Sequence, residues 1–154
     1  MKTCTFFGHR DCPGSVKPYL RAALVELIER HGVEQFYVGR QGAFDRMALS
    51  VLRELAEKYP HIGYAVVLEQ LPGTGGRLAV PRPDETIFPS GLESVPPRWA
   101  VLRRNEWMLK RADYVVTYVT HSWGGAARFA QKAARQKKTV LNLSHQAAGT
   151  EKEP

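Results

Sequence analysis

Three short segments of the sequence combine glycine with residues that suit an anionic ligand. They are Gly8-His9-Arg10, the stretch from Gly39 to Asp45, and the stretch from Thr120 to Ala126. Glycine lets the backbone approach a ligand closely or adopt a positive φ. Arginine, present in the first two segments, can contact a phosphate through two parallel hydrogen bonds. These residue types therefore indicate the binding of a phosphate-bearing ligand.

Each of these segments follows a stretch that is predicted to be a β-strand. Five short apolar runs are rich in β-branched and aromatic residues, and most are apolar on both faces, as in a buried parallel sheet. These runs are Cys4–Phe7, Phe36–Val38, Ile62–Leu68, Tyr114–Val119 and Val140–Leu143. The glycine segments follow the first, second and fourth of them.

Helices are predicted between the strands, because apolar residues recur there at helical spacing. The apolar stripes cover Leu20–Ile28, Phe44–Leu55 and Ala126–Ala134, and a further helix is expected from about Trp99 to Arg111. The first helix is expected to end at Gly32 and the second before Pro60. Strands and helices that alternate with short connections predict right-handed βαβ units.

The fold class expected is therefore α/β: a Rossmann-like three-layer sandwich of about five mostly parallel strands flanked by helices. In open α/β sheets, ligands bind beyond the carboxyl ends of the strands, near the point where strand order reverses. The glycine segments are expected to converge there, with the turns that hold Gly8 and Gly42 side by side. Each segment leads toward a helix N-terminus, where free N–H groups and the helix dipole attract anions.

The length of 154 residues suits one domain, predicted to cover residues 1–143. Residues 69–98 hold six of the ten prolines and are too irregular for a core element. They are interpreted as an insertion that acts as a lid or a partner surface. Residues 144–154 form a polar tail that is expected to be frayed.

The composition limits the class of protein. With 44% hydrophobic and 24% charged residues, the chain is neither disordered nor collagen-like. No apolar run approaches the roughly 18 residues of a membrane-spanning helix, so a cytoplasmic protein without membrane partners is expected. Cys4 and Cys12 lack metal-ligand spacing, so no metal site is expected. The net charge of +7 favours an anionic partner, although a basic surface also aids solubility.

Several residues have both a structural and a functional interpretation. Asp45, in the first turn of a helix, is either a capping carboxylate or a ligand of ribose hydroxyls. His9 is either a general acid or base or a hydrogen-bonding spacer. Trp123 is placed to stack on a base, whereas Trp99 and Trp107 are interpreted as packing residues.

Four motifs occur in order between Thr3 and Leu143. They are Phe7-Gly8-His9-Arg10, Gly39-Arg40-Gln41-Gly42-Ala43-Phe44-Asp45-Arg46-Met47-Ala48, Arg104-Asn105-Glu106-Trp107-Met108 and Trp123-Gly124-Gly125-Ala126. Together they resemble the SLOG superfamily, the Rossmann-like group that includes the DNA-processing protein DprA and the Lonely Guy enzymes, and most of all its small bacterial YpsA-like branch. The resemblance implies a nucleotide-derived ligand held by the glycine turns, with Arg104-Asn105 facing it.

The sequence departs from one motif of that group. Lonely Guy enzymes carry the motif PGGxGTxxE, whose glutamate belongs to the phosphoribohydrolase site. The corresponding stretch from Ser122 to Ala130 keeps two glycines but lacks the proline, the threonine and the glutamate. Asp45 and Glu106 are left as tentative catalytic carboxylates.

Three functions remain open at this point. The first is a binding module or sensor for a nucleotide or an ADP-ribose-like molecule, in which Arg10, Arg40 and Arg104 meet phosphates. The second is an N-glycosidase, phosphoribohydrolase or deoxyribosyltransferase-like enzyme, in which Asp45 or Glu106 activates water or stabilises the oxocarbenium-like centre. The third, single-stranded DNA binding, ranks last because no basic stretch interleaved with aromatic residues stands out.

The expected site combines residues from all of these motifs. The ligand-binding candidates are Gly8, His9, Arg10, Gly39, Arg40, Gly42, Asp45, Arg104, Asn105, Thr120, Ser122, Trp123, Gly124 and Gly125. No cofactor is assigned beyond a nucleotide-type ligand. The partners considered are that ligand, nucleic acid as a second choice, and a second copy of the chain in a homodimer.

Overall fold

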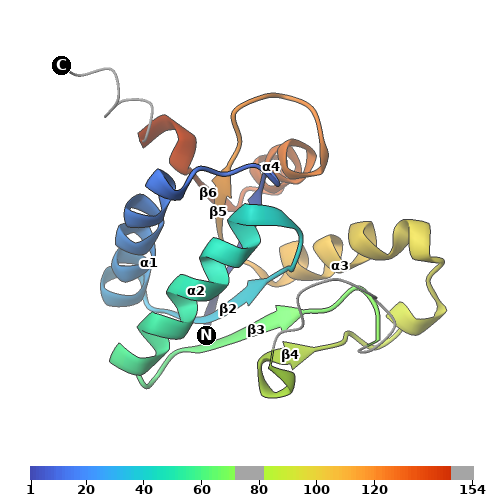
Figure 1. The fold of residues 1–154 in the computed structure, drawn as a ribbon, viewed down its shortest axis with the longest axis horizontal. Helices are drawn as coiled ribbons and strands as arrows, with labels where there is room; N and C mark the ends of the chain where they lie inside the picture. The colour runs from blue at the N-terminus through green and yellow to red at the C-terminus, as the bar shows by residue number, and fades with distance from the viewer. Residues whose placement is uncertain (72–81, 147–154) are drawn as a thin grey trace.

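The sheet is parallel throughout, so the carboxyl ends of its strands all lie at one edge. The structure, a computed structural model, describes residues 1–71 and 82–146. In that part of the chain, six strands pair in the order β4-β3-β2-β1-β5-β6 (Figure 1). The strands are β1 (Lys2–Gly8), β2 (Val33–Val38), β3 (Gly63–Val67), β4 (Thr86–Ile87), β5 (Tyr114–Tyr118) and β6 (Thr139–Asn142).

The α/β, Rossmann-like fold class is confirmed, with one additional strand. Five strands lie where the apolar runs predict them, but β4 lies inside residues 69–98, where no core element is expected from the sequence. Thr86 and Ile87 of β4 pair with Val66 and Val67 at the edge of the sheet. A strand of two residues is too short to show an alternating apolar pattern, which is why the expectation is wrong there.

The helices begin and end close to the predicted positions. They are α1 (Lys17–His31), α2 (Gly42–Lys58), α3 (Pro97–Arg111) and α4 (Gly125–Arg135), with short 3-10 turns η1 (Gly14–Val16), η2 (Pro83–Glu85) and η3 (Leu92–Ser94). Helix α1 ends at Gly32, whose φ of 70° is the left-handed conformation that glycine adopts easily. Helix α3 begins at Pro97 rather than Trp99, because proline suits the first helical turn.

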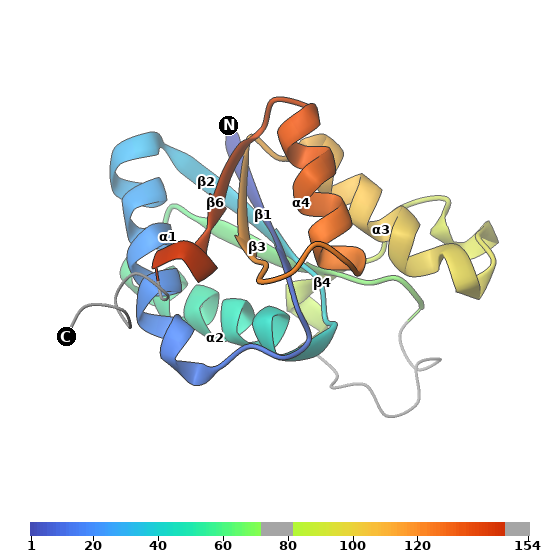
Figure 2. The same ribbon diagram turned by 90° about the horizontal axis from the view of Figure 1, so that it is seen from above.

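The helices cover the sheet in two layers. Helices α1 and α2 pack together on one face, and α3 and α4 pack together on the other (Figure 2). From β1 the chain moves outward through β2 and β3 to β4, and then returns through α3 to β5 on the other side of β1. Strand order therefore reverses between β1 and β5, which is the position where open α/β sheets bind ligands.

Strand β1 supplies side chains to both layers of the core. The ring of Phe6 lies 6.3 Å from that of Phe36 and 6.4 Å from that of Phe44, on the α1 and α2 side. The ring of Phe7 stacks at 5.1 Å on that of Phe129 in α4. Because successive side chains of a strand point to opposite faces, an apolar β1 joins the two layers.

The end of the chain departs from the expected polar tail. Residues 143–146 form one helical turn, and Leu143 is fully buried. The rest of the predicted tail, residues 147–154, lies outside the described residues. No helix of the described chain is long and apolar enough to cross a membrane.

A side chain at position 8 would collide with the core. A Cβ atom on Gly8 would lie 2.2 Å from Cδ2 of Phe44, whose ring is fully buried. We expect Gly8→Ala to lower the free energy of unfolding by about 1–3 kcal/mol, because overpacking must displace that ring. Gly14→Ala is the control, since nothing lies within 4 Å of a Cβ atom there. Urea unfolding measures both, and equal stability of the two variants would contradict this packing.

Candidate functional site

The first two glycine turns lie side by side at the carboxyl edge of the sheet. The N–H of Ala43 donates a hydrogen bond of 2.8 Å to the carbonyl of Arg10. Gly42 has a φ of 90°, and a Cβ atom there would lie 2.5 Å from Cα of Arg10. The prediction that the turns after β1 and β2 are neighbours is confirmed.

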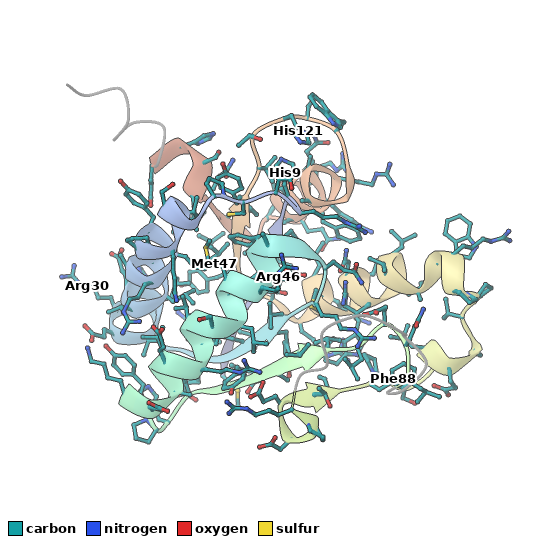
Figure 3. The ribbon with its side chains drawn as sticks, viewed as in Figure 1. His9, Arg30, Arg46, Met47, Phe88 and His121 are labelled. Carbon is teal, nitrogen blue, oxygen red and sulfur yellow. The ribbon has the colours of Figure 1, made fainter. Side chains whose placement is uncertain are left out.

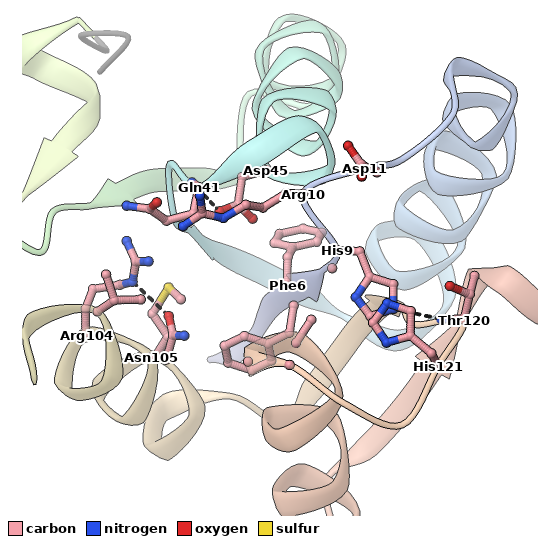
Figure 4. A pocket seen from close by; sticks show the side chains of 17 residues that line it. Phe6, His9, Arg10, Asp11, Gln41, Asp45, Arg104, Asn105, Thr120 and His121 are labelled. Carbon is pink, nitrogen blue, oxygen red and sulfur yellow. Dashed lines mark hydrogen bonds between the residues drawn. The ribbon is translucent and has the colours of Figure 1, made fainter. Parts of the chain in front are cut away.

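A cavity of ≈ 580 Å³ lies at this edge, beyond the carboxyl ends of β1 and β5 (Figure 4). The predicted site residues that line it are Gly8, His9, Arg10, Asp45, Arg104, Asn105, Thr120, Gly124 and Gly125. The predicted residues that do not line it are Gly39, Arg40, Gly42, Glu106, Ser122 and Trp123. The crossover point of the sheet therefore gathers residues from all three glycine turns and from α3.

Other residues of this cavity were not among the ligand-binding candidates predicted from the sequence, although several lie within the quoted motifs. They are Phe6, Phe7, Asp11, Gln41, Val101, Met108, His121 and Ala126. Val101 and Met108 lie three residues before and four residues after Arg104, so helical spacing places them on its face of α3. His121 lies within the third glycine turn, where no periodic pattern indicates which way a side chain points.

A buried ionic cluster lies beside the cavity. Glu69 accepts a hydrogen bond of 3.0 Å from Nε of Arg40 and one of 3.3 Å from Nη1 of Arg104. Arg104 is only 1% exposed, and its Nη1 also donates to the carbonyl of Val67 at 3.0 Å. Burial lowers the pKa of Arg104, while the charges of Asp45 and Glu69 act in the opposite direction. The cluster thus ties α3 to the end of β3 and to the turn after β2.

This cluster changes the interpretation of Arg40. The sequence places Arg40 in a glycine turn and so predicts a phosphate contact for it. In the structure its guanidinium pairs with Glu69 at 2.9 Å, and its side chain is 9% exposed. Arg40 does not line the cavity, and turning it toward a phosphate there would break its buried ion pair with Glu69.

Asp45 lies at the inner wall of the cavity and is itself buried. Its Oδ2 accepts a hydrogen bond of 2.8 Å from the N–H of Gln41, at the start of α2. Burial raises its pKa to about 6, against the opposing effect of the Arg104 charge. A Cβ atom on Gly39 would lie 2.9 Å from Oδ2 of Asp45 and 3.0 Å from Nη1 of Arg104. Asp45 therefore caps a helix and also lines the cavity, so both of its interpretations remain.

Glu106 points away from the site, although its neighbour Asn105 lines it. Its carboxylate pairs with Arg103 at 3.8 Å and with Lys132 of α4 at 3.6 Å. Its side chain is part of the outer surface between the two helices. Of the two tentative catalytic carboxylates, only Asp45 lies at the cavity.

Three stacked rings form a column at the mouth of the cavity. The rings of His9 and His121, labelled in Figure 3, are 3.8 Å apart. Those of His121 and Trp123 are also 3.8 Å apart. The N–H of Thr120 donates to Nε2 of His9 at 2.9 Å, which requires that nitrogen to be unprotonated. Burial lowers the pKa of His9, and His121 adds to this effect. His9 is thus held neutral between two turns, which favours the spacer role over acid–base chemistry.

Helix α4 begins at the cavity without a side-chain cap. Gly124 precedes the helix at a φ of 93°, and both Gly124 and Gly125 are exposed. The N–H groups of the first helical turn have no partner within the helix, and the helix dipole adds positive potential. Arg10 is exposed on the facing turn, and no described carboxylate pairs with its guanidinium. The cavity therefore presents two sources of positive potential to an anion.

Within 1–71 and 82–146, no three His, Cys, Asp or Glu side chains gather closely enough to hold a metal ion. The polar side chains that line the cavity are those of His9, Arg10, Asp11, Gln41, Asp45, Arg104, Asn105, Thr120 and His121.

No family model matches the sequence, and no curated protein sequence matches it. Solved structures with the same fold include DNA processing protein A (DprA) from Streptococcus pneumoniae, with a TM-score of 0.60 and 13% identity, over 91% of this chain and 49% of that chain. DprA from Helicobacter pylori gives a TM-score of 0.56 and 13% identity, over 97% of this chain and 73% of that one.

These likenesses define the class of the fold. This chain adopts the Rossmann-like fold found in DprA and spans about half the length of the Streptococcus pneumoniae protein. DprA belongs to the SLOG group that the sequence motifs resemble, so the comparison agrees with that resemblance at the level of the fold. The YpsA-like branch stays a prediction.

The raised pKa of Asp45 gives a testable dependence of stability on pH. Because the folded-state pKa of about 6 lies above the usual value of 3.8, the protonated carboxyl is the form that the fold favours. The contribution of Asp45 to the free energy of unfolding is therefore fully present below about pH 4 and is lost as the pH rises through about 6. We expect the wild type to lose about 1–3 kcal/mol relative to Asp45→Asn between pH 4 and pH 7. Urea unfolding across that range measures the difference, and a constant difference would contradict the shift.

Proposed function

We propose that this protein binds a nucleotide-type ligand in the cavity at the crossover point of its sheet. The observation that carries the proposal is the cavity itself, where the uncapped start of α4 and the exposed Arg10 face the same space. A phosphate placed there is bound by helix N–H groups and by one unpaired guanidinium. The remaining volume is available to a sugar and a base.

The other parts of the ligand match other walls of the cavity. Asp45 is the carboxyl that suits ribose hydroxyls, since it lines the cavity and keeps acceptor capacity beyond its bond to Gln41. A base suits the column of His9, His121 and Trp123, because Trp123 is 69% exposed at its outer end. Nucleotides and ADP-ribose-like molecules share these groups, and both belong to the proposed class.

Binding rather than N-glycosidic cleavage is the activity we propose. Glu106 is engaged on the outer surface, and Asp45 is held against the start of α2. Among residues 1–71 and 82–146, the only other carboxylate that lines the cavity is that of Asp11, and the glutamate of the Lonely Guy motif is absent. The wild type is therefore expected to bind nucleotides without releasing free base.

Single-stranded DNA binding is the second candidate. The Helicobacter pylori DprA with the same fold is described by its single-stranded DNA binding mode. The net charge of +7 on this chain suits a polyanion, and a strand that enters the cavity would present the same phosphate and base groups. The two candidate functions differ in the ligand required: the first needs a single nucleotide or an ADP-ribose-like molecule, and the second needs a strand of several nucleotides.

Arg10→Ala tests both candidates. We expect it to weaken binding of nucleoside monophosphates or ADP-ribose roughly 10- to 100-fold, because one charge-assisted hydrogen bond is lost. Thermal stability is expected to stay the same, since Arg10 is exposed. Arg30→Ala, an exposed arginine on α1, is the matched control.

Calorimetric titration measures the affinities, and a parallel assay monitors release of free base. If the wild type binds an oligothymidylate but neither monophosphates nor ADP-ribose, single-stranded DNA binding replaces the first candidate. Base release that Asp45→Asn removes would overturn the non-catalytic interpretation. Unchanged affinity in Arg10→Ala would show that this arginine is only surface charge.

A further inference from the structure

Helix α3 presents a second surface that shares no lining residue with the cavity. Trp99, Arg103, Trp107 and Arg111 follow one another at intervals of four residues, so they lie along one side of the helix. All four line an open groove of ≈ 540 Å³ between α3 and the segment around η3. This alternation of tryptophan and arginine is a basic stretch interleaved with aromatic residues, and it becomes contiguous only when the chain is helical.

The groove has an excess of positive charge. Arg103, Lys110 and Arg111 line it, and Glu106 is the only carboxylate that does so in the part of the chain that the structure describes. Glu106 is already paired with Arg103 and with Lys132. Among the described residues, no carboxylate forms an ion pair with Lys110 or Arg111. The cations of this surface therefore complement an anionic partner.

The groove is also apolar along the side formed by the η3 segment. Leu92 and Val95 line it, together with Pro89 and Pro96. Trp99 also lines the groove and is 47% exposed, although it is interpreted from the sequence as a packing residue. The guanidinium of Arg98 lies over its ring at 5.6 Å. Exposed tryptophan and arginine beside an apolar wall are the residue types that dominate binding energy at protein interfaces.

The contacts on the ring of Trp107 help to decide between two anionic partners, a single nucleic-acid strand and an acidic peptide. Its ring is covered on one side by the guanidinium of Arg111, at 3.7 Å, and the ring of Tyr37 meets it at 5.1 Å and 75°. A single nucleic-acid strand needs free ring faces on which successive bases stack. The apolar wall instead suits an aliphatic or aromatic side chain of a peptide.

We propose that this groove binds an acidic peptide segment of a partner protein. An apolar side chain of the segment packs between Leu92, Val95 and Trp99, and its carboxylates pair with Lys110 and Arg111. The proposal is independent of the nucleotide cavity, which lies on another side of α3.

The probe is a short synthetic peptide with one phenylalanine and one leucine among aspartates and glutamates, titrated calorimetrically against the full chain. We expect Trp99→Ala to weaken binding at least about tenfold, because a half-exposed tryptophan is the anchor. The double variant Lys110→Glu with Arg111→Glu is expected to do the same through charge reversal. Thermal melting checks that each variant is folded.

Two control variants distinguish binding in the groove from binding that depends only on the net charge or on any exposed tryptophan. Arg30→Glu reverses an exposed charge on α1, on the other face of the sheet (Figures 2 and 3). Trp123→Ala removes the exposed tryptophan of the ring column. Neither is expected to change peptide affinity.

The outcomes decide the proposal. Peptide binding that falls in the groove variants and not in the controls supports it. An oligothymidylate that binds with the same sensitivity to the groove variants, while the peptide does not bind, overturns it in favour of nucleic acid. Absence of binding by either probe, or equal loss in Arg30→Glu, also overturns it.

Discussion

The arrangement at the carboxyl edge of the sheet depends on one buried carboxylate, that of Glu69. It pairs with Arg40 from the turn after β2 and with Arg104 from α3, and Arg104 also holds the carbonyl that ends β3. Charges are costly to bury, so such a group persists only when partners and hydrogen bonds surround it. Breaking a buried pair of this kind costs roughly 3–5 kcal/mol, because an uncompensated charge is left behind. Glu69 thereby fixes the relative positions of two turns and a helix.

Helix α3 needs this attachment because few of its residues are apolar and buried. Its buried residues are Ala100, Arg104, Met108 and Leu109. The polar anchor of Arg104 leaves two other sides of the helix free for different partners. One side, with Val101 and Asn105, lines the cavity at the carboxyl ends of the strands, and the other, with Trp99 and Arg103, lines the groove.

Most of the fold could be predicted from the sequence because its signals are local. Strands buried on both faces are continuously apolar, and Gly32 and Pro60 mark where helices end, so five strands and four helices could be placed. Strand β4 could not, because its two residues pair with β3 through contacts that no short pattern encodes. The prediction that Trp99 is a packing residue was wrong for a similar reason. The exposure of its side chain depends on where the η3 segment lies, and that segment is not predicted from the sequence.

The location of the cavity could be predicted from the sequence, but the contacts that its side chains make could not. The position of the glycine turns after their strands brought Gly8, Arg10 and Gly124 to one cavity. The engagement of Arg40 depends on Glu69, which lies 29 residues away in the sequence, and turn chemistry alone carries no information about it. The column of His9, His121 and Trp123 likewise joins two loops that are far apart in the chain.

The carboxylates that surround each arginine indicate what that arginine does. Arg40 and Arg104 share the charge of Glu69, and their pairing stabilises the wall of the cavity. A phosphate that drew either guanidinium away from Glu69 would leave a buried carboxylate without that partner, and the ligand would have to offset the cost. Arg10 is exposed at the mouth of the same cavity with no described carboxylate partner, so a phosphate can pair with it without breaking anything. The burial and pairing of Arg104 are therefore the reason that we propose Arg10, rather than Arg104, as the phosphate ligand.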